Sequence, residues 1–157
     1  MSIEAEAREA ARQNRAIAAA VISQAVRDIS SRTPDHDTRS AILFIFGPDR
    51  TAEGWAGVLD IELDALRKKV AGYYARLSEG RAAAIEGRGQ NSPEVVRRRG
   101  RRALVRVRRF IDRSELPVWV RGSDGRPGRE EYRPYFALKG EAPEPGDDGE
   151  SKEREAA

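Results

Sequence analysis

The chain has 157 residues, of which 39% are hydrophobic and 35% are charged, enough for one domain with a sizeable core or for two small domains. Because it contains no cysteine, a disulfide framework and a thiolate zinc site are excluded, and a reducing compartment is indicated. No apolar run approaches the roughly 20 residues that a membrane-spanning helix needs, so we expect a cytoplasmic protein without a membrane partner.

The formal net charge of +3 hides three blocks of different charge. Residues 1–93 hold 13 basic and 13 acidic residues, residues 94–140 hold 14 and 6, and residues 141–157 hold 2 and 7, which gives net charges of 0, +8 and −5. The basic block favours a polyanionic partner, and nucleic acid is the obvious one. The acidic tail, residues 141–157, has no large apolar residue and is predicted to be disordered.

The first thirty residues are rich in good helix formers and contain neither glycine nor proline, which predicts one long helix. Residues 3–16 offer mainly alanine and charged side chains, so this half is expected to fray or to pair with another chain. The second half has an apolar face with helical spacing, formed by Ile17, Val21, Ile22, Ala25, Val26 and Ile29.

Two short helices are expected next. The first is capped by Asp37 and stopped by Gly47 and Pro48, with a strand over residues 41–46 as the alternative. The second is capped by Thr51 and ends near Asp60. The side chains expected to face inward are Ala41, Ile42, Leu43 and Phe46 in the first helix and Trp55, Val58 and Leu59 in the second.

A third helix is predicted over residues 63–77, because Leu63, Leu66, Val70, Tyr73 and Leu77 recur at spacings of three and four. The segment TAEGWAGVLDIELDALRKKV resembles the helix-turn-helix motif of small bacterial and phage or prophage DNA-binding proteins, and the resemblance extends over residues 39–77. It places Ala56 as the small residue of the first helix, Ile61 in the corner and Leu66 as the anchor of the second helix. Asp60 departs from the pattern, since such corners often carry glycine.

The resemblance implies that residues 63–77 are a DNA-recognition helix. Lys68 is then the best candidate for contact with a base edge or a phosphate, while Gly72 and Ala75 allow a close approach to the groove. The alternative is a helical hairpin whose basic residues are only solvated. The outward face comprises Asp64, Ala65, Lys68, Gly72 and Ala75, and Arg67, Lys69 and Arg76 flank it.

Residues 80–92 lack apolar periodicity and are predicted to link a helical domain, residues 1–79, to a second part, residues 93–140. Ser92, Pro93 and Glu94 are a strong signal for the start of a helix.

The helix predicted from Pro93 to Arg113 is rich in arginine. Its predicted apolar stripe holds Val96, Gly100, Ala103, Leu104, Val107 and Ile111, with Phe110 at its margin. Two columns of guanidinium groups lie beside the stripe, one with Arg97, Arg101 and Arg108 and the other with Arg98, Arg102 and Arg109. We expect the guanidinium groups to contact nucleic acid; the alternative is a surface that is only solvated or paired with acidic residues. A strand over residues 103–110, which would pair Val105 with Val107, is the alternative to the helix.

A β-hairpin is predicted from Val118 to Leu138, because alternating and aromatic segments flank a run of turn residues. Pro134 confines the second strand to an edge. Trp119 is expected to pack within the hairpin, whereas Arg126 and Arg129 near the tip are expected to contact phosphates.

The sequence contains no convincing catalytic constellation. His36 is the only histidine, and its setting between two aspartates in a proline-containing loop is typical of a turn rather than of a metal site. Asp60, Glu62 and Asp64 cluster at a helix corner, where capping and the helix dipole account for them. A phosphate-binding glycine loop is also absent. We therefore expect a protein that is not an enzyme and needs no cofactor or metal.

These patterns predict a mainly α protein, with a helix-turn-helix body, an arginine-rich helix, a β-hairpin and a disordered acidic tail. The expected function is binding of double-stranded DNA as a transcriptional regulator of phage or prophage type, by a homo-oligomer that pairs through the first helix. One alternative is an RNA-binding or antitermination-type factor, and another is the small, DNA-recognising subunit of a phage packaging machine. The acidic tail is expected to compete for the basic surface, to bind a partner protein or to act only as a solubilising extension.

Overall fold

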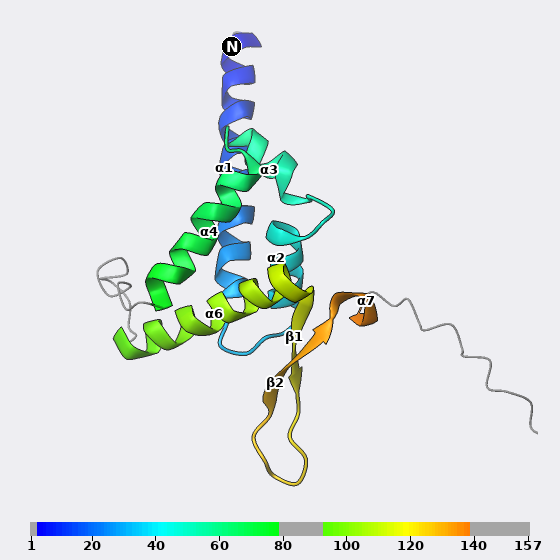
Figure 1. Ribbon diagram of the computed structural model, residues 1–157. Helices are drawn as coiled ribbons and strands as arrows, with labels where there is room; N and C mark the ends of the chain where they lie inside the picture. Colours follow the sequence, from blue (N-terminus) through cyan, green and yellow to red (C-terminus); the bar gives the residue numbers. More distant parts are fainter. Residues whose placement is uncertain (1–2, 79–92, 139–157) are drawn as a thin grey trace, which may run out of the picture.

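The computed structural model describes residues 3–78 and 93–138, and these are mainly helical with one two-stranded antiparallel sheet. Figure 1 shows α1 standing upright, α4 beside it, α6 lying across the lower end of the helical body, and the hairpin projecting below α6. The elements are α1 (Ile3–Ile29), α2 (His36–Phe46), α3 (Ala52–Val58), α4 (Leu63–Ser78), α6 (Pro93–Arg113), β1 (Glu115–Val120), β2 (Arg129–Pro134) and α7 (Tyr135–Leu138).

Only the second half of α1 belongs to the core. Ala18, Ile22, Ala25 and Ile29 are buried, and α2 and α3 are the elements that pack against them. Ile17, expected on the buried face, is exposed. The first half of α1 extends beyond the body (Figure 1), so no other element covers it.

Helix α2 forms where the sequence predicts a helix, but its cap is Asp35 and not Asp37. The Thr38 backbone N–H donates to Asp35 Oδ1 at 2.9 Å, and this hydrogen bond lowers the pKa of Asp35. The Thr38 hydroxyl donates to the Asp28 carbonyl at 2.9 Å. Thr38 therefore joins the start of α2 to the end of α1.

Helix α3 packs through alanine rather than through its larger side chains. Ala52 and Ala56 are completely buried, whereas Trp55 and Val58, predicted to face inward, are exposed. Alanine on the inner face lets this short helix approach α1 closely, and the bulkier side chains are left on the outer face.

The corner between α3 and α4 contains Asp60 in the left-handed conformation, with φ of 56°. Aspartate tolerates this conformation better than most residues other than glycine, so the departure seen in the sequence does not prevent a tight turn. The Ile61 N–H donates to the Ala56 carbonyl at 3.0 Å. Arg15 of α1 donates to Asp60 Oδ2 at 2.7 Å and ties the corner to the long helix.

Helix α4 is anchored to α1 by Tyr74. The apolar spacing in the sequence instead predicts that the neighbouring Tyr73 lies on the buried face. Tyr74 is completely buried, and its hydroxyl donates to the Val26 carbonyl. Burial raises the pKa of Tyr74 far above its usual value. Tyr73 is half-buried and meets the Tyr74 ring edge-on, with 5.2 Å between the ring centroids.

Helices α4 and α6 cross where α6 has no side chain. A Cβ atom placed on Gly100 would lie 2.2 Å from the Leu77 Cβ and 2.9 Å from the Ser78 backbone nitrogen. Both distances are shorter than van der Waals contact, so only glycine allows this approach. The crossing fixes the position of the arginine-rich helix on the helical body.

The buried side of α6 is rotated away from the predicted stripe. Ile111, predicted to be inside, is 58% exposed, and Leu104 is only half-buried. Phe110 and Arg106 are buried in their place. The helical conformation extends from residue 93 to residue 113, so the strand considered over residues 103–110 does not form. The buried set is Val96, Gly100, Ala103, Arg106, Val107 and Phe110.

The hairpin starts earlier and ends earlier than predicted. Strand β1 pairs with β2 from Glu115 opposite Pro134 to Val120 opposite Arg129. After Pro134 the chain turns into the short helix α7 instead of continuing as a strand. Pro134 has no N–H for a ladder and occupies the last position of β2, in agreement with its expected confinement.

One apolar core extends through both segments that the predicted linker separates. It includes Ile22 of α1, Leu66 of α4, Val107 of α6 and Tyr135 of α7. The predicted linker, residues 80–92, and the predicted tail, residues 141–157, lie outside the described residues. The described helices before and after the linker thus form a single packing unit.

The helix crossing leads to a stability prediction. Gly100→Ala should lower the free energy of unfolding by about 1–3 kcal/mol, because the new methyl group overlaps Leu77. Gly72→Ala in α4 is the matched control, since the nearest atom to its added Cβ is the end of the Arg76 side chain, 3.7 Å away. This control should gain up to about 1 kcal/mol from helix propensity. Urea denaturation measures both, and equal effects of the two substitutions would refute the close crossing.

Candidate nucleic-acid interface

A buried arginine holds α6, the end of α1 and the hairpin together. Arg106 is completely buried, and its Nη1 donates to the Ile29 carbonyl at 3.0 Å and to the Ser31 carbonyl at 2.7 Å. Its Nε and Nη2 donate to the two carboxylate oxygens of Glu130 on β2, at 3.0 and 3.1 Å. Such a two-pronged contact fixes both distance and orientation between α6 and the hairpin.

Tyr132 completes this cluster by donating its hydroxyl to Glu130 Oε1 at 2.7 Å. Burial acts to raise the pKa of Glu130, but hydrogen bonds from Arg106 and Tyr132 outweigh it, and the pKa is lowered. The pKa of Tyr132 is raised, first by burial and then by the neighbouring carboxylate. The cluster therefore holds an ionised carboxylate beside a neutral phenol at neutral pH.

None of these three residues is a site expected from the sequence. Arg106 belongs to neither predicted guanidinium column, Glu130 is expected only as part of a strand, and Tyr132 is expected only as an aromatic residue of the hairpin that packs or stacks on a base. A signal was present, because Arg106 lies three residues after Ala103 and four before Phe110, beside the apolar stripe. Its acceptor Ser31 lies 75 residues earlier in the chain, which no local pattern reveals.

The outward face of α6 carries the exposed arginines. Arg101, Arg102 and Arg108 are exposed and form no ion pair with a carboxylate among the described residues. Arg98 is exposed and lies 3.6 Å from Glu94 of the same helix, a weak contact in water. Arg97 is also exposed. We call Arg97, Arg98, Arg101, Arg102 and Arg108 the α6 arginine face.

Arg109, predicted to be part of a guanidinium column, is held by the hairpin instead. Its Nη1 lies 3.3 Å from Glu115 Oε2, and its guanidinium carbon lies 4.1 Å from the centre of the Tyr132 ring. Both contacts orient the side chain along β1 and β2. Arg109 therefore reinforces the joint between α6 and the hairpin.

Helix α4 presents a smaller basic surface. Lys68, Lys69 and Arg76 are exposed and form no ion pair with a described carboxylate, and Asp64 is exposed as well. Arg67 instead binds backbone: its Nε donates to the Ile45 carbonyl at 2.9 Å and its Nη2 to the Gly47 carbonyl at 2.8 Å. Arg67 thus caps the end of α2.

The hairpin carries the remaining predicted residues. Arg126 is exposed next to the turn, where Asp124 and Gly125 adopt positive φ. Arg129 is exposed, but its Nε donates to Glu131 Oε1 at 2.8 Å. Trp119 is 45% exposed, and its ring covers Gly128 so closely that a Cβ there would lie 2.7 Å from it.

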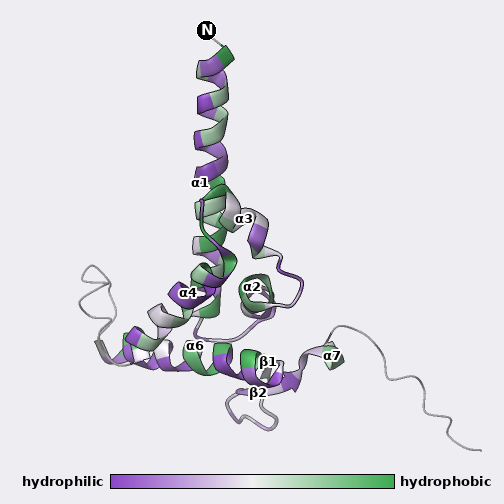
Figure 2. Ribbon diagram, turned by 45° about the horizontal axis from the view of Figure 1, so that its top comes forward, coloured by the Kyte–Doolittle hydropathy of each residue, from purple (hydrophilic) through white to green (hydrophobic). Residues whose placement is uncertain are grey.

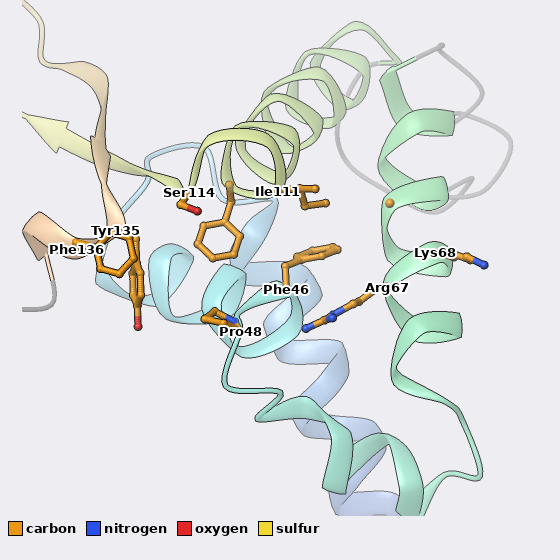
Figure 3. Close-up of a pocket in the computed structure, with 10 residues that line it drawn as sticks. Phe46, Pro48, Arg67, Lys68, Ile111, Ser114, Tyr135 and Phe136 are labelled. Atoms are coloured by element: carbon orange, nitrogen blue, oxygen red, sulfur yellow. The ribbon is translucent and has the colours of Figure 1, made fainter.

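A groove of about 750 Å³ is lined by the end of α2, by α4, by the last turn of α6 and by α7. Figure 3 shows Arg67 extending from α4 toward Phe46 and Pro48, whereas Lys68 points away from them. Ile111 and Phe136 form exposed apolar walls. The residues that line the groove include one seryl hydroxyl group, that of Ser114, and neither a histidine nor a carboxylate.

The acidic and histidine motifs occupy structural positions. Asp35 is the α2 cap, and the exposed His36 has its Nδ1 3.6 Å from Asp37 Oδ1. Asp60 occupies the corner and binds Arg15. Within residues 3–78 and 93–138, no three side chains of the metal-binding types come together.

Comparisons of the chain with family models, with curated proteins and with solved structures found no match. Among the described helices, none has the length and apolar character that crossing a bilayer requires.

Breaking the buried cluster should destabilise the protein. Arg106→Met leaves the Glu130 carboxylate without its cation, and we expect the free energy of unfolding to fall by about 3–5 kcal/mol. The double variant Arg106→Met/Glu130→Leu removes both charges and should recover much of this loss. Arg101→Met, on the exposed face, is the control and should change stability by no more than about 0.5 kcal/mol. Chemical denaturation measures the free energy of unfolding of the wild type and the three variants. A negligible effect of Arg106→Met would contradict the role of Arg106 in holding α6, α1 and the hairpin together.

The pKa of Glu130 predicts how this contribution depends on pH. The pKa of Glu130 is lower in the folded than in the unfolded protein. The stabilisation that its ionised carboxylate provides is therefore fully present above the unfolded-state pKa of about 4.3, and it is lost as the pH falls through the folded-state pKa. The stability difference between wild type and Glu130→Gln should therefore be largest near neutrality and shrink in acid. Denaturation measured from neutral to acidic pH tests this, and a difference that grows in acid would reverse the assigned direction.

Proposed function

We propose that the protein binds double-stranded DNA without catalysing a reaction, as a transcriptional regulator of the phage or prophage type. The support comes from the α6 arginine face and from the resemblance of residues 39–77 to helix-turn-helix segments. The arginine face would supply affinity for phosphates, and the helix-turn-helix segment would read the base sequence of the DNA.

The observation that carries the proposal is that Arg101, Arg102 and Arg108 lie exposed on one helix and form no ion pair with a carboxylate among the described residues, although Arg102 also acts on Glu130 through its charge. The exposed Arg98 lies three residues before Arg101 and four before Arg102, and like charges at these spacings repel each other on a helix, a repulsion that a polyanion relieves. The buried Arg106 and the hairpin-bound Arg109 fix the rotation of α6. The face is thus a surface held in place by the fold.

The two basic helices are neighbours, which supports their use on one nucleic acid. They cross at Gly100 and Leu77, so Arg101 and Arg76 are each one residue from the crossing. Lys68 and Lys69 are further exposed cations of α4. In this proposal α4 enters a groove, with Lys68 as its leading cation, and α6 contacts the phosphate backbone.

The hairpin supports a second candidate, RNA binding. Trp119 has one side on Gly128 and is 45% exposed, which leaves aromatic surface on which an unpaired base could stack. Arg126 and Arg121 lie nearby on the same hairpin and are exposed. The relative affinity for duplex and single-stranded ligands decides between the two candidates.

Charge removal tests the proposed interface. The triple variant Arg101→Gln/Arg102→Gln/Arg108→Gln should weaken binding to a duplex of arbitrary sequence and reduce the slope of log affinity against log salt by roughly 2 to 3 units. The matched control Arg27→Gln/Arg32→Gln/Arg50→Gln removes the same charge from exposed positions outside α4, α6 and the hairpin. Fluorescence anisotropy at several salt concentrations measures both, and equal losses would show that only overall charge matters.

A competition titration separates the candidates. Duplex DNA should displace structured RNA from the wild-type chain, and Lys68→Ala should reduce the preference for a selected DNA sequence over a random one. Preference for RNA, together with a strong loss on Trp119→Ala, would replace the DNA proposal with the RNA candidate. Binding of neither ligand in low salt would refute both.

A further inference from the structure

The first half of α1 is a helix that no other element covers. From residue 3 to residue 17 every side chain is exposed, and Ile3 and Ile17 remain 84% and 53% exposed. Arg15 reaches Asp60 at the corner, but this contact covers no apolar surface. Figure 1 shows this half extending past α3 into solvent. Isolated helices of about 15 residues are marginal in water, so a segment of this kind gains stability when it packs against a partner.

One row of this helix has the spacing of a coiled-coil seam. Its members follow one another at alternating intervals of four and three residues, and none is charged. The seam ends in Val21, which is half-buried where the body begins. Figure 2 shows hydrophobic turns interrupting the hydrophilic ones along this projecting part. We call this row the α1 seam: Ile3, Ala7, Ala10, Asn14, Ile17 and Val21.

The seam lies beside the face that α1 turns to its own body and meets it at Val21. Ala18, Ile22, Ala25 and Ile29 form the buried face, and no seam residue belongs to it. Short alanine side chains in the middle of the seam allow two helices to approach closely, with isoleucine near both ends. A partner can therefore cover the seam from Ile3 to Ile17 without displacing a buried side chain.

The charges along the exposed part of α1 indicate which partner fits. Residues 3–9 hold three glutamates and one arginine, a net charge of −2, whereas residues 10–17 hold two arginines and no acid, a net charge of +2, and Arg15 of this part also contacts Asp60 of its own chain. A second copy running antiparallel brings the acidic part of each helix beside the basic part of the other. A parallel copy would instead place like charges together.

The same arrangement matches the apolar residues. In an antiparallel pair Ile3 of one copy lies near Ile17 and Val21 of the other, and Ala10 lies near the twofold axis, with Asn14 close by to form a polar contact. The contacts of Arg8 with Glu4, at 3.8 Å, and of Arg12 with Glu9, at 3.9 Å, lie outside the seam. They leave the seam open to the other copy.

We propose that two copies of this chain pair through the α1 seam, with their α1 helices antiparallel. The partner is thus a second copy, and the interface is distinct from the α6 arginine face. The proposal does not rest on nucleic-acid binding, since every observation that carries it concerns α1.

The test is the mass of the full chain in solution. Sedimentation equilibrium of the wild type at high micromolar concentration should give twice the chain mass of 17.4 kDa. Ala10→Glu places two like charges at the axis and should raise the dissociation constant by roughly tenfold or more. Ala5→Glu, on the opposite side of the same exposed helix, is the matched control and should leave the dimer intact. A monomeric wild type, a ring-sized oligomer, or equal effects of the two variants would overturn the proposal.

The orientation has its own test, because the chain has no cysteine. Ile3→Cys chains mixed with Ile17→Cys chains should form a mixed disulfide dimer on oxidation, whereas Ile3→Cys chains alone should not. Efficient crosslinking of Ile3→Cys to itself would show a parallel pair and overturn the antiparallel arrangement. Both measurements are made without nucleic acid, so their outcome is independent of the test of DNA binding.

Discussion

The burial of one guanidinium group is the constraint on which the arrangement of the second half of the molecule depends. Arg106 can be buried only if its charge and its N–H groups are satisfied, and the chain at the end of α1 and strand β2 supply what it needs: two backbone carbonyls and one carboxylate. Because the acceptors come from distant segments, satisfying Arg106 fixes where α6 and the hairpin lie relative to α1. Tyr132 and Arg109 then strengthen the same joint.

This constraint also decides which arginines face solvent. Turning Arg106 inward rotates α6, so that Ile111 moves to the surface and Phe110 into the core. The crossing at Gly100 sets the position of α6 along α4. With its rotation and position both fixed, α6 presents its arginine face in one orientation. A surface used to bind phosphates benefits from such preorganisation, because less side-chain and backbone freedom is lost on binding.

Two surfaces of different character result, and they are located on different elements. One is the α6 arginine face, whose side chains are exposed. The α1 seam is uncharged and begins at the far end of the long helix (Figure 1). A dimer that forms through α1 would carry two α6 arginine faces, one from each chain, as expected of a protein that binds a site with twofold symmetry.

The sequence by itself determined the helices, because their signals are local: periodicity predicted α4, and the Pro93 start signal predicted α6 over residues 93–113. Of the six arginines in the two predicted columns of α6, all but Arg109 are exposed. The sequence could not identify Arg106 as buried or Arg67 as a helix cap, since their acceptors are brought near only by folding. The choice of Asp35 over Asp37 as the cap of α2 was also missed, although its donor Thr38 lies only three residues away. Nor could the sequence assign Trp55, Val58 and Ile111 to the surface, because apolar residues are buried only where another element covers them. Tertiary structure decided these cases, since burial depends on neighbours distant in the chain.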